Sequence, residues 1–421
     1  MNEQKYLNAM RSEIRPALGC PEPVAVALAV AKARETLGCM PEQIVLRVSA
    51  NILKNAMGVG IPGTGMVGLE VASALSCIAG RSAYGLEVLS AATQDDCQSA
   101  AVVAKAGIIK VETKDTPKKL YIEAELSAAG HTAMCIIEDA HTQITHVQLD
   151  DKIIESMNVE ACPPSMDTSF DLTVAGIWDF ITTVDVEKLD FLKEVIAVNS
   201  SVAREGLRKD YGMRVGRVLM DQKSVRATSL TDYVCAFTAA AADARMAGCT
   251  MSVMSTCGSG NQGITASLPV AAAAEWMGES EEKMLRAEAL SQLITVHIKK
   301  YIGKLSPLCG CAIAASIGSS CGVAYLMGGD LRAIVCAIQN MIADISGLIC
   351  DGAKPGCALK IASSVASAMQ CAQLALKGIS AGNLDGIVTE NVEKSIHNLG
   401  NLGNAGMERT DRVILDMMIS K

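Results

Sequence analysis

Short runs in which apolar and polar side chains alternate occupy much of the first third of the chain. A period of two is typical of strands that bury one face. The runs are Ile44–Ser49, Ile108–Glu112, Leu120–Ser127, Ala133–Glu138 and Gln143–Leu149. An apolar helix, Val24–Leu37, precedes them and ends before Gly38. We therefore predict one mainly antiparallel sheet accompanied by helices.

Helical periodicity dominates the chain beyond a Pro-containing loop, Ala161–Asp167. The helical segments are Phe170–Thr182, Val186–Asn199, Ser229–Met246, Glu279–Ile302, Leu331–Leu348, Ala358–Leu376 and Thr410–Ile419. The two patterns together predict an α+β protein. Its first part, residues 1–165, contains the sheet and carries Cys20 and the loop Asn51–Gly65. Its second part, residues 166–421, is predominantly helical.

Composition changes this picture only in the apolar regions. Of the 421 residues, 50% are hydrophobic but only 3% are aromatic, which suits closely packed helices. Residues Cys309–Gly329 carry no charge and are long enough to cross a bilayer. Most of them are Ala, Gly, Ser and Cys, which gain little free energy in hydrocarbon. We therefore expect a buried helix there and no membrane contact.

The acidic charge balance limits the partners of the chain. With a net charge of −8, a pI near 5.3 and no basic run, it would repel the phosphates of a nucleic acid. The first residues lack the basic and apolar regions of a signal peptide, so we expect a cytoplasmic protein. Its 16 cysteines should then be reduced. Whether it forms a homo-oligomer stays open.

Several loops are rich in Gly, Asn, Ser and Cys although very apolar helices adjoin them. Buried irregular backbone is costly unless its polar groups are satisfied, so a functional site is expected in such loops. They are Gly19–Pro23, Asn51–Gly65, Thr256–Gly263, Leu308–Cys311 and Cys350–Cys357.

Cysteines in the last two of these loops have the strongest chemical signal. Cys309 and Cys357 lie where helices are predicted to begin, and Cys350 shares the turn-rich loop before Cys357. A helix N-terminus lowers the pKa of a thiol and favours metal ligation. The chain has no paired C-x₂₋₄-C knuckles of a zinc site, and the C-x-C of Cys309 and Cys311 is too tight. Three dispersed thiolates fit an iron–sulfur cluster better and leave one iron free to bind substrate.

Two further positions are candidates for proton transfer. Two prolines, Pro21 and Pro23, follow Cys20, which lies near a helix start, so its thiol should be acidified. A buried, inert cysteine is the alternative interpretation. His141 and His146 bracket a predicted strand turn, and either is a base or a structural residue.

Binding candidates lie in and near the glycine-rich loop that contains Ser259, Asn261 and Gln262. Glycines allow close approach of the backbone, and amides leading into a helix bind a carboxylate or a phosphate. Arg245 lies shortly before this loop, where its guanidinium can clamp a carboxylate. Pairing with Asp243, or with the C-terminus of its own helix, is the alternative for Arg245.

These motifs together resemble the L-cysteine desulfidase family, which is related to the iron–sulfur L-serine dehydratases. The resemblance extends in order over nearly the whole chain. Its motifs are ALGCPEPVAVALA, ILKNAMGVGIPGTGMVG, DARMAG, GSGNQGITASLPV, LSPLCGCA and MIADISGLICDGAKPGCALK.

The resemblance implies that Cys309, Cys350 and Cys357 hold a [4Fe–4S] cluster, which would make residues 166–421 the cluster-binding part. Cys20 matches the conspicuous cysteine of the family's GC-x-EP motif. Related serine dehydratases can place a C-terminal cysteine on the fourth iron. This chain ends in MMISK, which favours an open iron.

The activity implied by the resemblance is the breakdown of a small-molecule substrate, L-cysteine, to hydrogen sulfide, ammonia and pyruvate. Dehydration of L-serine with the same cofactor is the alternative. The substrate would be bound by Asn51, Arg245, Ser259, Asn261 and Gln262, whereas the base is Cys20 or His141. The assignment of these binding residues and candidate bases rests both on the resemblance and on their positions in the loops.

Two other classes of function remain as alternatives. The loop Gly258–Gly263 also looks like the SGN loop of pyridoxal-phosphate lyases, which need a Schiff-base lysine upstream. Lys223 lies upstream but lacks the expected context. A non-catalytic iron or redox sensor would use the same cysteines, but no DNA-binding helix pair or basic face supports it.

Overall fold

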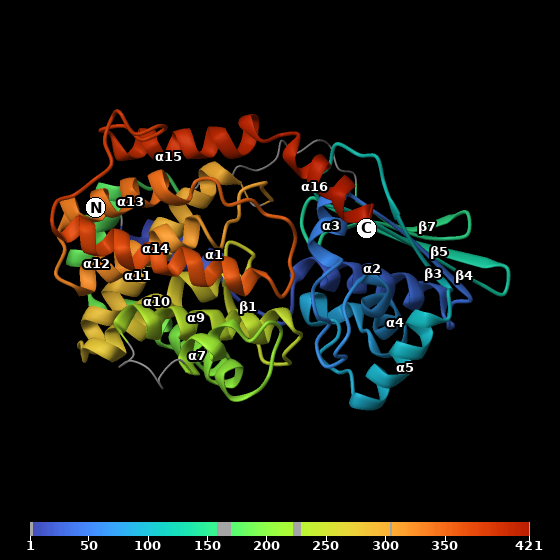
Figure 1. The fold of residues 1–421 in the computed structure, drawn as a ribbon. Helices are drawn as coiled ribbons and strands as arrows, with labels where there is room; N and C mark the ends of the chain where they lie inside the picture. Colours follow the sequence, from blue (N-terminus) through green and yellow to red (C-terminus); the bar gives the residue numbers. More distant parts are fainter. Residues whose placement is uncertain (1–2, 158–169, 222–228, 304, 421) are drawn as a thin grey trace.

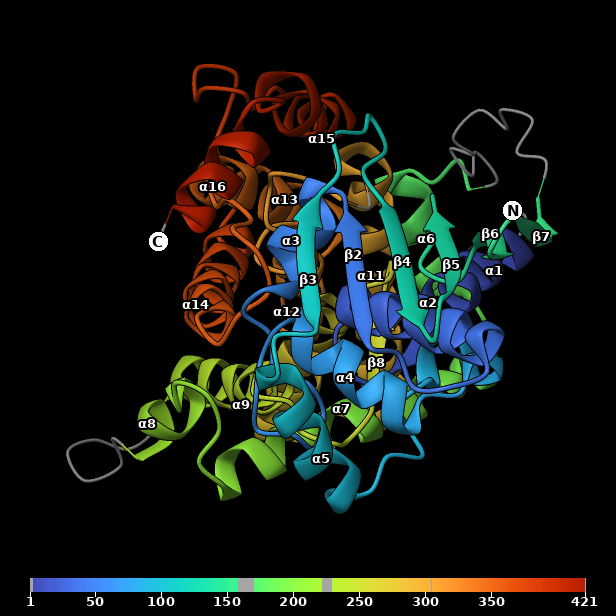
Figure 2. The ribbon, with the colours of Figure 1, turned by 90° about the vertical axis from the view of Figure 1, so that its right-hand side faces the viewer.

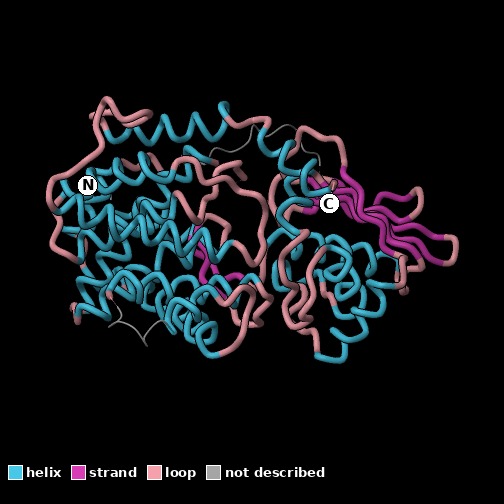
Figure 3. The backbone as a smooth tube through the Cα atoms, in the orientation of Figure 1, coloured by secondary structure: helices cyan, strands magenta, loops and turns pink. Residues whose placement is uncertain are grey.

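The computed structural model describes residues 3–157, 170–221, 229–303 and 305–420 (Figure 1). The predicted loop Ala161–Asp167 and Lys223 lie outside these ranges. Figure 3 shows the long strands gathered at one end of the molecule, while loops run between that end and the helical part. The division at residues 165 and 166 stays a prediction, because it falls outside the described residues.

A six-stranded sheet is the centre of the first part, with the strand order β3-β2-β4-β5-β6-β7 (Figure 2). Only β2 and β3 are parallel, so the predicted, mainly antiparallel sheet is confirmed. The strands are β2 (Gln43–Val48), β3 (Ile109–Thr113), β4 (Tyr121–Ala128), β5 (His131–Glu138), β6 (Ile144–Leu149) and β7 (Lys152–Ser156). The sequence pattern did not reveal β7, because every residue of this edge strand is exposed.

Helix α2 (Pro21–Leu37) covers the sheet by packing on β4, β5 and β6. Its buried face is rich in alanine, so the helix approaches closely, and alternate residues Ile44, Leu46 and Val48 of β2 belong to the same core. The helix ends at Gly38, which has a φ of +78° that favours glycine. Further helices of this part are α3 (Ala50–Ala56), α4 (Leu69–Ala79) and α5 (Gln94–Lys105).

The second part is a helical bundle in which α10 and α12 are almost entirely buried and α11 is buried over most of its length. Its helices are α6 (Val174–Thr183), α7 (Phe191–Arg208), α8 (Val215–Asp221), α9 (Leu230–Met246), α10 (Gly260–Met277), α11 (Glu281–Ile302), α12 (Ala314–Leu326), α13 (Leu331–Ile345), α14 (Cys357–Leu376) and α15 (Val392–Asn401). The helical segments expected from periodicity are helical, which confirms the α+β class. The segment expected at Val186–Asn199 begins as a 3₁₀ turn, Val186–Leu189, and continues as α7.

The uncharged stretch Cys309–Gly329 contains α12, which packs between α10, α11, α13 and α14. The expectation of a buried helix is therefore confirmed. In the described ranges, no helix is both long enough and apolar enough to cross a membrane.

Both ends of the chain cross from one part to the other. Helix α1 (Glu3–Glu13) packs in the core of the helical part, and β1 (Ile14–Ala17) pairs antiparallel with β8 (Val253–Thr256). At the other end, α16 (Thr410–Ile419) packs on α3 of the first part. Because β1 is held at β8, the residues directly after it, including Cys20, lie where the two parts meet.

Candidate active site

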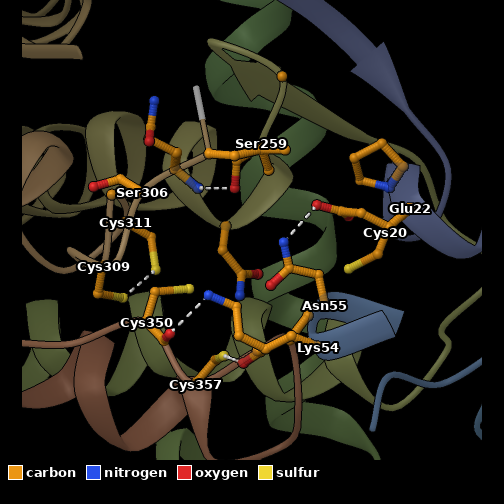
Figure 4. Close-up of a pocket in the computed structure, with 18 of the residues that line it drawn as sticks. Cys20, Glu22, Lys54, Asn55, Ser259, Ser306, Cys309, Cys311, Cys350 and Cys357 are labelled. Atoms are coloured by element: carbon orange, nitrogen blue, oxygen red, sulfur yellow. Dashed lines mark hydrogen bonds between the residues drawn. The ribbon is translucent and has the colours of Figure 1, made fainter. Parts of the chain in front are cut away.

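A pocket of about 120 Å³ lies where the two parts meet, and we call it the junction pocket (Figure 4). It brings together every site residue predicted from the sequence except the two candidate bases His141 and His146. Those lining it are Cys20, Asn51, Arg245, Ser259, Asn261, Gln262, Cys309, Cys350 and Cys357. The predicted loop at Asn51–Gly65 differs in one respect, because its first residues form the short helix α3.

Backbone pairing brings the cysteine loops together although they are far apart in the sequence. The amide of Cys309 donates to the carbonyl of Leu348 at 2.9 Å, and the amide of Cys350 donates to the carbonyl of Pro307 at 2.6 Å. Leu308 and Ile349 form the bridge between them. The loop before α12 is thus pinned to the loop before α14.

Four thiols face one side of the junction pocket (Figure 4). Cys309 and Cys311 have their sulfur atoms 3.5 Å apart, and Cys350 lies beside them. Cys357, the first residue of α14, directs its thiol to the carbonyl of Gly352 at 3.7 Å. Cys311 was not predicted to be a ligand, but its thiol lies in the same group as those of Cys309, Cys350 and Cys357.

The spacing of these thiols does not suit a site for a single metal ion. Among the described residues, no three histidine, cysteine or acidic side chains are close enough to hold one metal ion. An iron–sulfur cluster is larger, and each of its irons takes its own cysteine, so its ligands are spaced further apart. A set of soft sulfur donors around a pocket fits such a cluster and does not suit a hard cation.

The expectation of acidified thiols is wrong for most of these cysteines. Cys20 is the N-cap of α2, yet burial raises the pKa of its thiol to about 11, against the opposing charge and hydrogen bond of Arg245. Burial also raises the pKa of Cys357 to about 12, and it raises that of Cys350. Only at Cys309 is the pKa lowered, chiefly by the hydrogen bond from Cys311. Desolvation of a buried anion outweighs the helix dipole at the other positions.

Three lysines that the sequence analysis did not select surround the thiols. Lys54 of α3 is only 2% exposed, and its Nζ lies 3.2 Å from the carbonyl of Cys350 and 2.5 Å from Asp411 Oδ1. Lys299 is buried on α11, where desolvation lowers its pKa, and Lys360 pairs with Asp351. The charges of Lys54 and Lys360 oppose the rise in the pKa of Cys350. Nothing in the sequence distinguished them, since their role depends on packing.

Arg245 provides a separate positive charge in the pocket. Its Nη1 donates to Asn261 Oδ1 at 3.1 Å and its Nη2 donates to the carbonyl of Gly19 at 2.9 Å. The side chain is 5% exposed, and its buried Nε has no partner among the described residues. Asp243 is not its partner, because Asp243 accepts the amide of Gly216 at 2.9 Å. Among the described residues, no carboxylate forms an ion pair with this buried guanidinium, which lines the pocket.

The glycine-rich loop brings α10 against this guanidinium. A Cβ at Gly260 would lie 2.3 Å from Arg245 Nε, so the close approach requires glycine. Ser259 is the N-cap of α10 and accepts the amide of Gln262, whose Nε2 in turn donates to the carbonyl of Thr256 at 3.1 Å. The first turn of α10 thus presents its amide end to the pocket, as the sequence predicted.

His141 lies elsewhere. It occupies the turn between β5 and β6 and is not among the residues that line the junction pocket. The sequence did not reveal how far His141 lies from Cys20, because that distance depends on how the sheet packs against the rest of the protein. Glu22 and Asn55 also line the pocket; both lie in motifs that carry the resemblance, but no role was predicted for either of them.

Comparison with known proteins agrees with this geometry. A family model described as the serine dehydratase alpha chain matches residues 83–416. A UPF0597 protein of Clostridium perfringens is 44% identical over 418 residues, covering 99% of this chain and 98% of the relative. A UPF0597 protein of Bacteroides fragilis is 43% identical over 424 residues, covering 100% and 99%. The chain therefore belongs to the serine dehydratase alpha chain family of lyases.

Proposed function

We propose that this protein is a [4Fe–4S]-dependent lyase that converts L-cysteine to hydrogen sulfide, ammonia and pyruvate. The observation that carries the proposal is the junction pocket itself. It combines the thiols of Cys309, Cys350 and Cys357 with a buried Arg245 that forms no ion pair with a carboxylate of the described residues. Sulfur ligands for iron and a cation for a carboxylate are the two requirements of such a reaction.

Cys309, Cys350 and Cys357 would hold the cluster. When bound, it supplies an iron with no protein ligand, which acts as a Lewis acid for the departing sulfur. Lys54 and Lys360 hold positive charge beside these thiols and offset the negative charge of the ligands. In this proposal Cys311 is a neighbour of Cys309 and no ligand.

The remaining residues bind and orient the amino acid. Arg245 binds the substrate carboxylate together with Asn51 and the groups of Ser259, Asn261 and Gln262 at the start of α10. Fixing the carboxylate determines where the Cα–H bond points, which is a requirement of proton transfer.

Cys20 is the proposed base at Cα, because it lines the pocket and His141 does not. Burial raises the pKa of the Cys20 thiol, whereas the charge and hydrogen bond of Arg245 favour its thiolate, which is the form that would accept the proton. Loss of the Cα proton and cleavage of the Cβ–S bond give 2-aminoacrylate and sulfide. The enamine tautomerises, and water hydrolyses it to pyruvate and ammonia.

L-Serine would react at the same groups, with a hydroxyl as the leaving group. We place the preference on L-cysteine because a soft sulfur displaces water from iron more readily than a hydroxyl does. The test is anaerobic reconstitution with iron and sulfide, followed by turnover of both amino acids.

Sulfide and pyruvate should appear from L-cysteine in equal amounts. The kcat/KM for L-cysteine should exceed that for L-serine at least about tenfold, or ~1.4 kcal/mol. A preference for serine would make the protein a dehydratase with the same cofactor. A cluster without turnover of any amino acid would favour the sensor, and a lysine aldimine band in the absorption spectrum would favour the pyridoxal-phosphate lyase.

A further inference from the structure

We propose that Glu22 and Asn55 form a subsite for the α-ammonium group of the substrate. This inference rests on the proposed lyase function and extends it, because it makes the pocket selective for α-amino acids over acids of the same shape without the amino group. Both residues lie in motifs of the sequence, but no role was predicted for them there, and neither is used by the reaction steps given above.

Glu22 is a buried carboxylate with little compensation from the protein. It is the second residue of α2, is 8% exposed and lines the junction pocket. Within the described residues its only hydrogen-bond partner is Asn55, whose Nδ2 donates to Glu22 Oε1 at 3.0 Å. A carboxylate in such a place is costly unless a cation or several donors neutralise it.

Asn55 adds an unused acceptor at the same place. Its Nδ2 is occupied by Glu22, whereas its Oδ1 is buried and has no partner in the part of the chain that the structure describes. Buried side-chain oxygens normally have a donor, so an oxygen facing a pocket without one indicates a ligand with N–H or O–H groups.

The neighbouring lysine, Lys54, donates no hydrogen bond to Glu22 or to Asn55 Oδ1. Lys54 precedes Asn55 in α3, but its Nζ is directed to the carbonyl of Cys350 and to Asp411. In Figure 4, Glu22 and Asn55 lie with Cys20 on one side of the pocket, across from Cys309, Cys311 and Cys350. A ligand in the pocket can therefore supply donors to Asn55 Oδ1 and to the carboxylate of Glu22.

An α-ammonium group has the required chemistry. It has three N–H donors and a positive charge, enough for the carboxylate of Glu22 and for Asn55 Oδ1. An amino acid then meets three complementary groups in one pocket. Its carboxylate meets Arg245, its ammonium group meets Glu22 and Asn55, and its side-chain sulfur points to the cysteine side.

The test compares L-cysteine with 3-mercaptopropanoate, which has the same carboxylate and thiol but no ammonium group. Glu22→Gln keeps the shape and removes the charge. Glu35→Gln is the matched control, because Glu35 lies on the same helix but is exposed and accepts the amide of Ser82 at 2.8 Å. Reconstituted proteins are measured for iron content, for kcat/KM with L-cysteine and for inhibition by 3-mercaptopropanoate.

In Glu22→Gln we expect kcat/KM for L-cysteine to fall at least about tenfold, as for loss of a charge-assisted hydrogen bond. The inhibition constant of 3-mercaptopropanoate should change less than about threefold. Iron content should stay unchanged, and the Glu35→Gln control should behave as the parent protein. Asn55→Ala should show the same selective loss, which keeps the test decisive if Glu22→Gln does not fold.

An equal loss for both compounds, or no loss for L-cysteine, would overturn the ammonium subsite while the parent protein still turned over its substrate. If the parent protein turned over no amino acid, the proposed function would fail separately. Calorimetric binding of the same two compounds would then decide the subsite, since selective weakening of L-cysteine binding in Glu22→Gln supports it and unselective binding overturns it.

Discussion

Replacing Glu288 by Gln should stabilise the protein at neutral and alkaline pH, because it removes a buried carboxyl group that titrates. Glu288 lies on α11 and is 0% exposed. Its Oε1 accepts Gln292 Nε2 at 2.9 Å, and its Oε2 has no hydrogen-bond partner among the described residues. Gln292 in turn accepts the hydroxyl of Thr256 at 2.8 Å, so the pair lies behind the loop that leads into α10.

The magnitude follows from the pKa of Glu288. Burial raises it from an ordinary value of 4.5 to about 8, so the folded protein holds a proton that the unfolded chain releases above pH 4.5. The contribution of Glu288 to the free energy of unfolding is fully present below pH 4.5 and is lost as the pH rises toward 8. The difference between the two values corresponds to about 5 kcal/mol. Gln keeps the acceptor for Gln292 and does not titrate.

The free energy of unfolding is measured anaerobically by urea titration for both proteins from pH 5 to pH 8.5. We expect the advantage of Glu288→Gln to grow by about 1.4 kcal/mol per pH unit up to about pH 8 and then to level off. Glu282→Gln, at an exposed position of the same helix, should show no such slope. An advantage that does not depend on pH would refute a neutral, buried Glu288.

The remaining predictions concern the junction pocket. Replacing any one cluster cysteine by Ala should remove most iron and activity, whereas Cys311→Ala should keep both. The three positions are Cys309, Cys350 and Cys357. The opposite result for Cys311 and Cys309 would contradict the ligand assignment. Cys20→Ala should retain iron and lose turnover, and a loss of iron would instead make it the fourth ligand. Arg245→Lys should raise the KM for L-cysteine at least about tenfold without loss of iron, because an ammonium group cannot make the paired hydrogen bonds of a guanidinium; an unchanged KM would place the carboxylate elsewhere.

Local patterns were sufficient for most of the architecture. A period of two identified the strands from β2 to β6, and helical spacing identified the long helices, because each element buries one face. The pattern failed where no such face exists. β7 is fully exposed, and α10 begins in a segment whose glycines and asparagine looked like loop. β1 and β8 are short strands that pair with each other across more than 200 residues of sequence, a distance that no local window covers.

Residue chemistry in the sequence also limited the candidates for the site. Thiols, a guanidinium and glycine-rich loops beside apolar helices indicated where a ligand would bind, since buried irregular backbone needs partners. Nearly all of these candidates line one pocket, and their identities did not depend on knowing the fold.

Tertiary structure alone decided which candidates meet and how their charges behave. It excluded His141, and it brought Lys54, Glu22 and Asn55 to the pocket, because those positions follow from the packing of α2 and α3 against the helical part. It also reversed the expected pKa of Cys20. A helix start can be identified in the sequence, whereas desolvation depends on every neighbour that excludes water, and those neighbours come from distant segments of the chain.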